Sequence, residues 1–256
     1  MIDEPLARGI SPVHALDARV RLVACLSLSL VAAVATTLRA PAVILLTGLV
    51  LTILSRPPWR VVWARLGAVN AFVLFLWLVL PVTAPGTPLW HFWGLSVSRE
   101  GVWLTFAITL KSNAIFLCIL SLVATIPAPA LGRALTFLRV PDKFSFLFLF
   151  TYRYLHVIAE EYGRLSTAAR LRGFAPATNR HTYRTYAALV AMVLVKSYDR
   201  SQRVYQAMLL RGFTGTFPSL DRFRAGRVDT VFLILAMAVA LLAACLDVLG
   251  RRGHVF

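Results

Sequence analysis

The sequence predicts an all-α polytopic membrane protein with about five to six membrane helices and a pair of amphipathic cytoplasmic helices. Of the 256 residues, 59% are hydrophobic and 15% are charged, and the mean hydropathy is +0.73. Water-soluble domains carry about 25% charged residues. Several apolar runs approach the roughly 20 residues that cross a bilayer. The net charge of +16 is concentrated in residues 128–227, which contain 16 Lys/Arg and 5 Asp/Glu.

The apolar runs divide the chain into three predicted regions. Residues 1–127 form an N-terminal transmembrane domain, residues 128–227 lie in the cytoplasm or on the membrane surface, and residues 228–256 form a C-terminal membrane helix. The first region contains four spans, and the fifth span lies in the last region. Their expected positions are about 20–38, from 41 to about 54, 68–82, 102–126 and 228–249.

The arginines near these runs predict the orientation. Arg56, Arg60 and Arg65 cluster between the second and third spans. Because basic loops face the cytoplasm, we expect this loop and the N-terminus to be cytoplasmic, in the inner membrane. The loop at 83–100 is then external, and its Trp90 and Trp93 suit the headgroup layer. The C-terminal side stays open, because parity places it outside whereas Arg251 and Arg252 argue for the inside.

The basic region contains a short predicted helix at about 130–138 and two long helices at about 142–173 and 182–211. In the first long helix, small or apolar residues recur in alternating steps of four and three, which is the period of one helix face. Asp142 is the expected N-cap. Each long helix has an apolar first half and a charged second half. Such helices can begin in the bilayer and emerge into the cytoplasm.

Both long helices end in the word A-x-x-L-R-G-F, at residues 168–174 and 207–213. The glycine fits the first position after a helix, where a left-handed backbone is needed. The arginine then lies at the helix C-terminus, where the helix dipole favours a cation. Two such ends suit two acidic grooves on a partner. The alternative is that both words are ordinary helix ends, because Arg-Gly is common there.

With these paired words, the chain resembles the T component of energy-coupling factor (ECF) transporters, and the longer second word is similar to the cobalt-type subgroup, CbiQ. The resemblance implies a membrane scaffold whose two coupling helices dock on two ABC-type ATPase subunits, and whose membrane part holds a substrate-binding S component. It implies ATPase contacts at one set of residues in each word: Ala168, Arg172 and Gly173, and Ala207, Arg211 and Gly212.

Several patterns are missing from the sequence. It has no G-x-x-x-x-G-K-[ST] phosphate loop, so we expect ATP to be hydrolysed on partner subunits and not by this chain. The five histidines and three cysteines show no metal-ligand spacing, and we expect neither a bound metal nor another cofactor. No nucleic-acid motif accompanies the positive charge.

Lys111 is an ionisable residue well inside a predicted span. Such residues are functional candidates, and under the ECF resemblance Lys111 contacts the S component. The alternative is that its side chain reaches an interface or pairs with a backbone carbonyl. The sequence leaves both open.

Two other classes of function remain as alternatives. A self-contained secondary transporter or channel predicts several polar groups at mid-membrane depth, together with inverted repeats. A membrane enzyme needs converging His, Asp or Ser residues, whereas Asp17, Asp229 and Asp247 are widely spaced in the sequence. Within the ECF hypothesis the cargo also stays open between cobalt, nickel and a vitamin.

Overall fold

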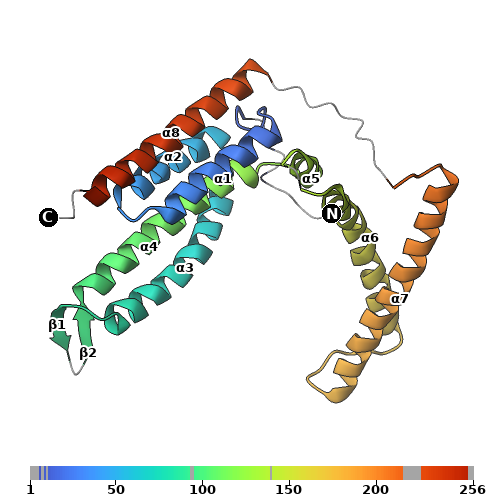
Figure 1. Cartoon of the computed structure of the whole chain (residues 1–256). Coiled ribbons are helices and arrows are strands. Elements are labelled where there is room, and N and C mark those ends of the chain that lie inside the picture. The colour runs from blue at the N-terminus through green and yellow to red at the C-terminus, as the bar shows by residue number, and fades with distance from the viewer. Residues whose placement is uncertain are drawn as a thin grey trace. The chain divides into compact units, whose positions relative to one another are not determined.

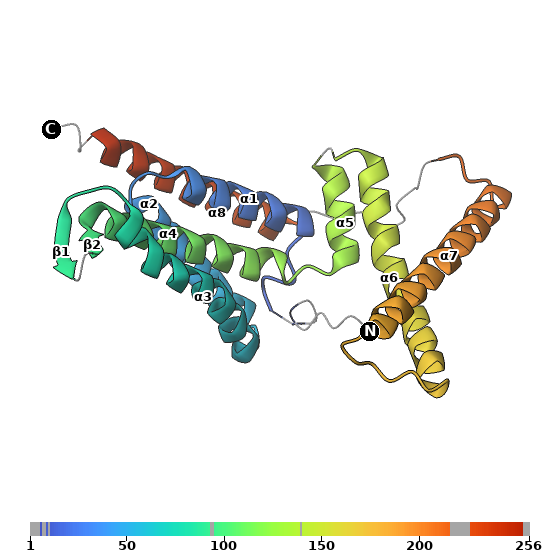
Figure 2. The ribbon, with the colours of Figure 1, turned by 90° about the horizontal axis from the view of Figure 1, so that it is seen from below.

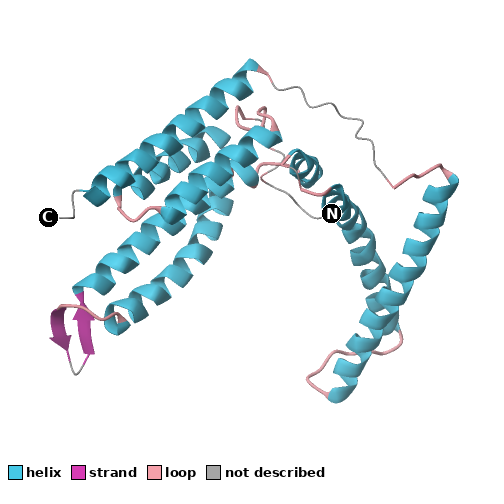
Figure 3. Cartoon of the chain, in the orientation of Figure 1, coloured by secondary structure: helices cyan, strands magenta, loops and turns pink. Residues whose placement is uncertain are grey.

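The computed structural model describes residues 6, 9, 11–92, 95–138, 140–215 and 226–252. The chain divides into two compact units, which we describe separately. The membrane bundle comprises Glu4–Ala134 and Phe223–Phe256, and the crossed-helix unit comprises Met1–Asp3 and Leu135–Arg222. Helices make up most of both units (Figure 3).

The membrane bundle is built around α4 (Arg99–Cys118), which continues through a π-helical turn at Ile119–Val123. This helix packs against three others, and α8 packs against two of them (Figures 1 and 2). The short α5 begins in this unit, and its residues up to Ala134 pack against the start of α1. The bounds are α1 Ala18–Val34, α2 Arg39–Ser55, α3 Trp59–Thr83, α5 Ala128–Phe137 and α8 Arg227–Arg252.

Small side chains form the interior of the bundle and large apolar ones face outwards. Ala24 and Ala32 of α1 and Ala243 of α8 are fully buried in one cluster. By contrast, Leu78 of α3 is 73% exposed and Leu241 of α8 is 63% exposed. Membrane helices associate through small residues that allow close approach, while lipid covers the large apolar ones. The packing is therefore that of a membrane protein.

Among the described residues, three helices are long and apolar enough to cross a membrane: Trp59–Thr83, Arg99–Val123 and Arg227–Gly250. The first two predicted spans correspond to α1 and α2, which have 17 residues each. The first expected span extended to residue 38, but α1 ends at Val34. It ends there because the following turn directs its backbone N–H groups to a carboxylate of α8.

Two buried carboxylates of α8 bind the two ends of α1. Asp229 accepts a hydrogen bond of 2.8 Å from the backbone N–H of Asp17, the N-cap residue of α1. At the other end, one oxygen of Asp247 accepts bonds from the backbone N–H groups of Thr36 and Thr37 at 2.8 and 2.7 Å. The same oxygen also accepts from both threonine hydroxyls. These bonds align α1 with α8 along their whole length.

The external loop expected at 83–100 contains a two-stranded hairpin of β1 (Pro88–Phe92) and β2 (Leu95–Ser98). The strands are antiparallel and pair His91 with Ser96. Trp93, which we assigned to the headgroup layer, lies outside the described residues. Where the hairpin leads into α4, a Cβ on Gly101 would lie 2.7 Å from the carbonyl oxygen of Leu80. Glycine therefore permits the close approach of α4 to the end of α3.

The crossed-helix unit consists of α6 (Asp142–Leu171) and α7 (Arg180–Leu210), which cross one another (Figures 1 and 2). Both helices lie within two residues of their expected bounds. Asp142 is not the N-cap of α6, because Pro141 occupies that position and its carbonyl already accepts a bond from Phe144. Asp142 is the first helical residue instead.

We predict that Asp247→Ala lowers the stability of the chain by about 1–3 kcal/mol, because it removes the acceptor of the hydrogen bonds from Thr36 and Thr37. Thermal unfolding of the full chain in detergent measures this as a lower midpoint. Asp199→Ala is the control, since Asp199 is exposed on α7. Equal unfolding midpoints for the two variants would show that the carboxylate does not hold α1 to α8.

Candidate functional site

The two repeated words form helix ends of the same geometry. Gly173 and Gly212 have φ values of 85° and 78°, in the left-handed region. In the first word, Gly173 N–H donates to the carbonyl of Arg170 at 3.0 Å and Phe174 N–H to that of Ala169 at 3.1 Å. These two bonds define a Schellman cap. The corresponding bonds in the second word also measure 3.0 and 3.1 Å.

The exposed and the partly buried side chains occur at the same positions in both words. The first position and the third to sixth positions are exposed, and the second and seventh are partly buried. At the fourth position, Leu171 is 84% exposed and Leu210 is 91% exposed. Single exposed apolar side chains are common on protein surfaces, but this one recurs at the same position of both words, beside the same arginine. The two ends, which we call the helix tips, therefore present equivalent surfaces.

Each helix tip carries an exposed arginine as its C-cap residue, Arg172 on α6 and Arg211 on α7. Neither guanidinium has an ion-pair or hydrogen-bond partner within the part of the chain that the structure describes. Ala168 and Ala207, one turn earlier, are also exposed. Each tip thus combines a cation, an apolar side chain and a small residue that permits close approach.

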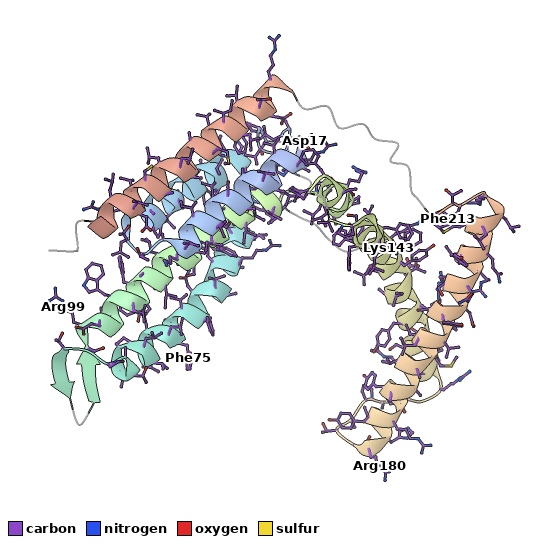
Figure 4. The ribbon with its side chains drawn as sticks, in the orientation of Figure 1. Asp17, Phe75, Arg99, Lys143, Arg180 and Phe213 are labelled. Atoms are coloured by element: carbon purple, nitrogen blue, oxygen red, sulfur yellow. The ribbon has the colours of Figure 1, made fainter. Side chains whose placement is uncertain are left out.

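The helix tips lie at opposite ends of α7. The α6 tip is next to the start of α7, because the ring of Phe174 packs on Tyr186 with centroids 5.6 Å apart. Figure 4 shows Phe213, in the second tip, at the far end of α7 from Arg180. A helix of 31 residues is about 46 Å long. The two tips are therefore well separated along α7.

The crossing of α6 and α7 is held by Glu161, whose side chain is 11% exposed. Lys196 Nζ of α7 and Arg164 Nη2 of α6 each donate to its carboxylate at 2.5 Å. A second α7 cation, Arg200, lies 3.8 Å from the same group. One carboxylate therefore joins α6 to α7 at a single point.

The same contacts change the acidity of Glu161. Hydrogen bonds from Lys196 and then from Arg164 stabilise the carboxylate and lower its pKa from 4.5 to about 2. Burial acts in the opposite direction but is the smaller effect. Glu161 is therefore ionised throughout the neutral range, and its ion pairs with α7 are fully formed there.

Lys111 donates from its Nζ to the carbonyl oxygen of Ala33 at 3.2 Å. Ala33 lies in the last turn of α1, where carbonyl groups lack partners within the helix. This contact corresponds to the backbone-carbonyl alternative. It leaves two further N–H donors of the amine for another partner.

The sequence that forms these helix tips matches a known protein family. The profile of the family described as "CbiQ: Cobalt transport protein" matches residues 9–220, which include both helix tips. The chain belongs to the CbiQ cobalt transport protein family. It is therefore a membrane component of a transport family and not a member of a catalytic enzyme family.

Two relatives of this CbiQ family member differ in similarity and coverage. It is 30% identical to the cobalt transport protein CbiQ of Rhodobacter capsulatus over 151 residues, which are 59% of this chain and 62% of the relative. It is 20% identical to an uncharacterized protein of Methanocaldococcus jannaschii over 229 residues, which are 88% of this chain and 85% of that protein. The first match thus spans less than two thirds of its relative.

Glu161 was not predicted from the sequence as part of the site. The repeat identified the helix tips, because each tip is formed by seven consecutive residues. Glu161 and Lys196 are 35 residues apart, and neither stands in a motif. The available signal was an acidic residue inside a strongly basic segment, with Arg164 three residues later. Local spacing alone could not identify the partner on α7.

The left-handed glycines lead to a prediction for the cap geometry. Nothing lies within 4 Å of a Cβ added to Gly173 or Gly212, so only backbone conformation opposes a side chain there. A left-handed L-residue costs about 1–2 kcal/mol, with Asn tolerated best and β-branched residues worst. We expect Gly173→Val to reduce hydrogen-exchange protection at the Phe174 amide, and Gly173→Asn to retain most of it.

Gly163→Val is the matched control for this measurement. Gly163 lies inside α6, has no positive φ and is equally free of crowding. The protection of Phe174 should therefore be unchanged in this variant. Loss of protection in the Asn, Val and control variants alike would show that the cap does not depend on the left-handed glycine.

The lowered pKa of Glu161 predicts a pH dependence of the crossing. Because the folded pKa lies below the ordinary value of 4.5, the contribution of Glu161 is fully present above pH 4.5 and is lost as the pH falls towards about 2. We expect Glu161→Gln to destabilise the full chain in detergent at pH 6, and this difference from the unmodified chain to shrink between pH 4.5 and 2. Thermal unfolding at each pH measures it.

Glu160→Gln provides the control for the pH series, because Glu160 is adjacent and exposed. Its unfolding midpoint should follow that of the unmodified chain at every pH. A Glu161→Gln deficit that stays constant down to pH 2 would contradict the assignment of the ion pairs.

Proposed function

We propose that this chain is the transmembrane coupling subunit of an ECF-type importer driven by ATP, with cobalt ions as its cargo. The observation that carries the proposal is the equivalence of the two helix tips. The same cap, the same order of exposure and the same arginine occur twice, towards opposite ends of α7. Such a pair fits two copies of one kind of groove, as a dimer of ABC-type ATPase subunits provides.

At each tip, the arginine is the electrostatic contact and the preceding leucine is the apolar one. Arg172 and Arg211 each bind acidic side chains of one ATPase groove, and the helix dipole keeps the cation oriented at the helix end. Leu171 enters the groove that binds Arg172, and Leu210 enters the groove that binds Arg211. Each leucine then loses contact with water. Ala168 and Ala207 allow the groove wall to approach, while Gly173 and Gly212 end the helix directly behind the arginine.

The crossing at Glu161 converts movement of the tips into a change in the angle between α6 and α7. From the crossing, the α6 tip lies 11 residues away and the α7 tip 15 residues away, which are about 16 and 22 Å of helix. ATP binding closes the ATPase dimer and moves both tips. The helices rotate about the crossing. The membrane helices are covalently attached to them and transmit this rotation to a substrate-binding S component.

The remaining parts of the importer follow from this role. ATP is hydrolysed on the ATPase subunits and the S component binds the cargo. Two N–H donors of Lys111 are available to the S component in the membrane. The chain resides in the inner membrane with its N-terminus in the cytoplasm, on the same side as the ATPases. Cobalt is supported by the family match and by the name of the Rhodobacter capsulatus relative.

Charge reversal at the tips tests the proposal. We expect Arg172→Glu and Arg211→Glu each to weaken docking by about 2–5 kcal/mol, because each leaves buried acidic groups of the groove without a cation. The measurement is the amount of ATPase subunit that copurifies with the tagged chain, together with ATP-dependent cobalt uptake. Leu171→Asp and Leu210→Asp should lower both quantities as well.

Arg203→Glu is the matched control, since Arg203 is exposed on α7 and lies eight residues before Arg211. It makes the same change in net charge and should leave docking and uptake unchanged. If both tip variants retain their ATPase subunits and transport normally, the coupling function is wrong. Cobalt uptake by the purified chain alone would instead favour a self-contained transporter.

A further inference from the structure

A cavity of about 550 Å³ opens at the hairpin end of the membrane bundle. It lies between the start of α4 and the turn that joins α1 to α2. Figure 4 shows Arg99 at this end of α4. The lining residues are Thr36 and Leu38 from the turn, and Arg99, Glu100, Trp103, Leu104 and Ala107 from α4. The cavity is not part of the helix tips, which belong to the other unit.

The length of α4 places this cavity in the headgroup layer. The continuous helix Arg99–Val123 has 25 residues, so it is about 37 Å long. The hydrocarbon core is about 30 Å thick, so both helix ends extend beyond it. Trp103 lies one turn inside the end, at a depth where indole rings are enriched. The polar side of the cavity therefore faces phospholipid headgroups, and the apolar side faces the upper acyl chains.

The polar lining combines one cation with one carboxylate. Arg99 is exposed, and its guanidinium has no ion-pair partner within 4.0 Å in the described part of the chain. Glu100 is held in place by Thr87, whose N–H and hydroxyl donate to its carboxylate at 2.8 and 3.0 Å. Each carboxylate oxygen can accept a further bond. The site thus offers a fixed acceptor beside an unpaired planar cation.

These groups match a zwitterionic phospholipid headgroup. A guanidinium binds phosphate through paired N–H groups. A carboxylate and an indole face both attract an ammonium group. A purely anionic headgroup would meet the negative charge of Glu100, whereas a headgroup with both charges satisfies both side chains. Leu38, Leu104 and Ala107 provide the apolar surface for the glycerol and the first acyl carbons.

We propose that this cavity is a binding site for one phospholipid of the phosphatidylethanolamine type. Its phosphate binds Arg99, and its ammonium group lies between Glu100 and Trp103. The bound lipid fills the space beside α4 that the α1–α2 turn leaves open. The site is independent of the coupling function, because it requires only that α4 crosses the bilayer.

Native mass spectrometry of the full chain tests this site. The chain is purified in detergent, incubated with equal amounts of phosphatidylethanolamine and phosphatidylglycerol, and examined for retained lipid. We expect one phosphatidylethanolamine to be retained per chain. Arg99→Gln should lower its retention about tenfold, which corresponds to the loss of one charge-assisted hydrogen bond. Glu100→Gln should abolish the preference over phosphatidylglycerol while keeping the bonds to Thr87.

Arg60→Gln is the control, because Arg60 is exposed at the other end of the neighbouring helix α3. It should retain the lipid like the unmodified chain. A competition arm adds soluble glycerophosphoethanolamine: displacement of the lipid at equal concentration would assign the site to a free phosphate ester. Equal retention in all variants would overturn the site. So would crosslinking of Trp103→Cys to a partner subunit at full yield, because a protein segment would then occupy the cavity.

Discussion

The crossing of α6 and α7 depends on one carboxylate, that of Glu161, and on the three cations around it. The helix α6 contains four Lys/Arg and three Asp/Glu, and α7 contains five Lys/Arg and one Asp. Charges of the two helices meet at Glu161, because Lys196 and Arg164 both donate to its carboxylate and Arg200 lies nearby. The buried residues described in this unit are few: Ser145, Glu161, Thr182 and Leu189. A crossing with so little buried surface is fixed in position mainly by that carboxylate.

The membrane bundle is held together by a different kind of contact. Lipid tails are as apolar as leucine, so burying large side chains gains little between membrane helices. The bundle instead buries small residues such as Ala32 and Ala243 and uses carboxylates at the helix ends. Asp229 and Asp247 bind backbone N–H groups at the two ends of α1. Polar contacts at the ends and small residues in the middle together fix how α1 and α8 align.

The sequence predicted the elements whose signals are local. The helix tips followed from seven-residue words, and both glycines adopt the left-handed conformation expected of them. The contacts that join distant segments were not predictable in this way. Asp247 and Thr36 are 211 residues apart, and no local pattern pairs them. The hairpin was missed for a related reason, because a segment rich in Pro, Gly and Trp indicates a loop, and its strand pairing depends on both halves together.

Under the proposed function, the contrast between the two units has a mechanical consequence. A lever must be stiff along its arms and free to change angle at its pivot. The Schellman caps keep each tip helical up to its arginine, so a force on the tip is not absorbed by fraying. At the pivot, Glu161 is bonded to donors on both helices, and long Lys and Arg side chains allow those ion pairs to persist while the angle changes. A large apolar interface between the helices would resist such rotation, because close-packed side chains interlock.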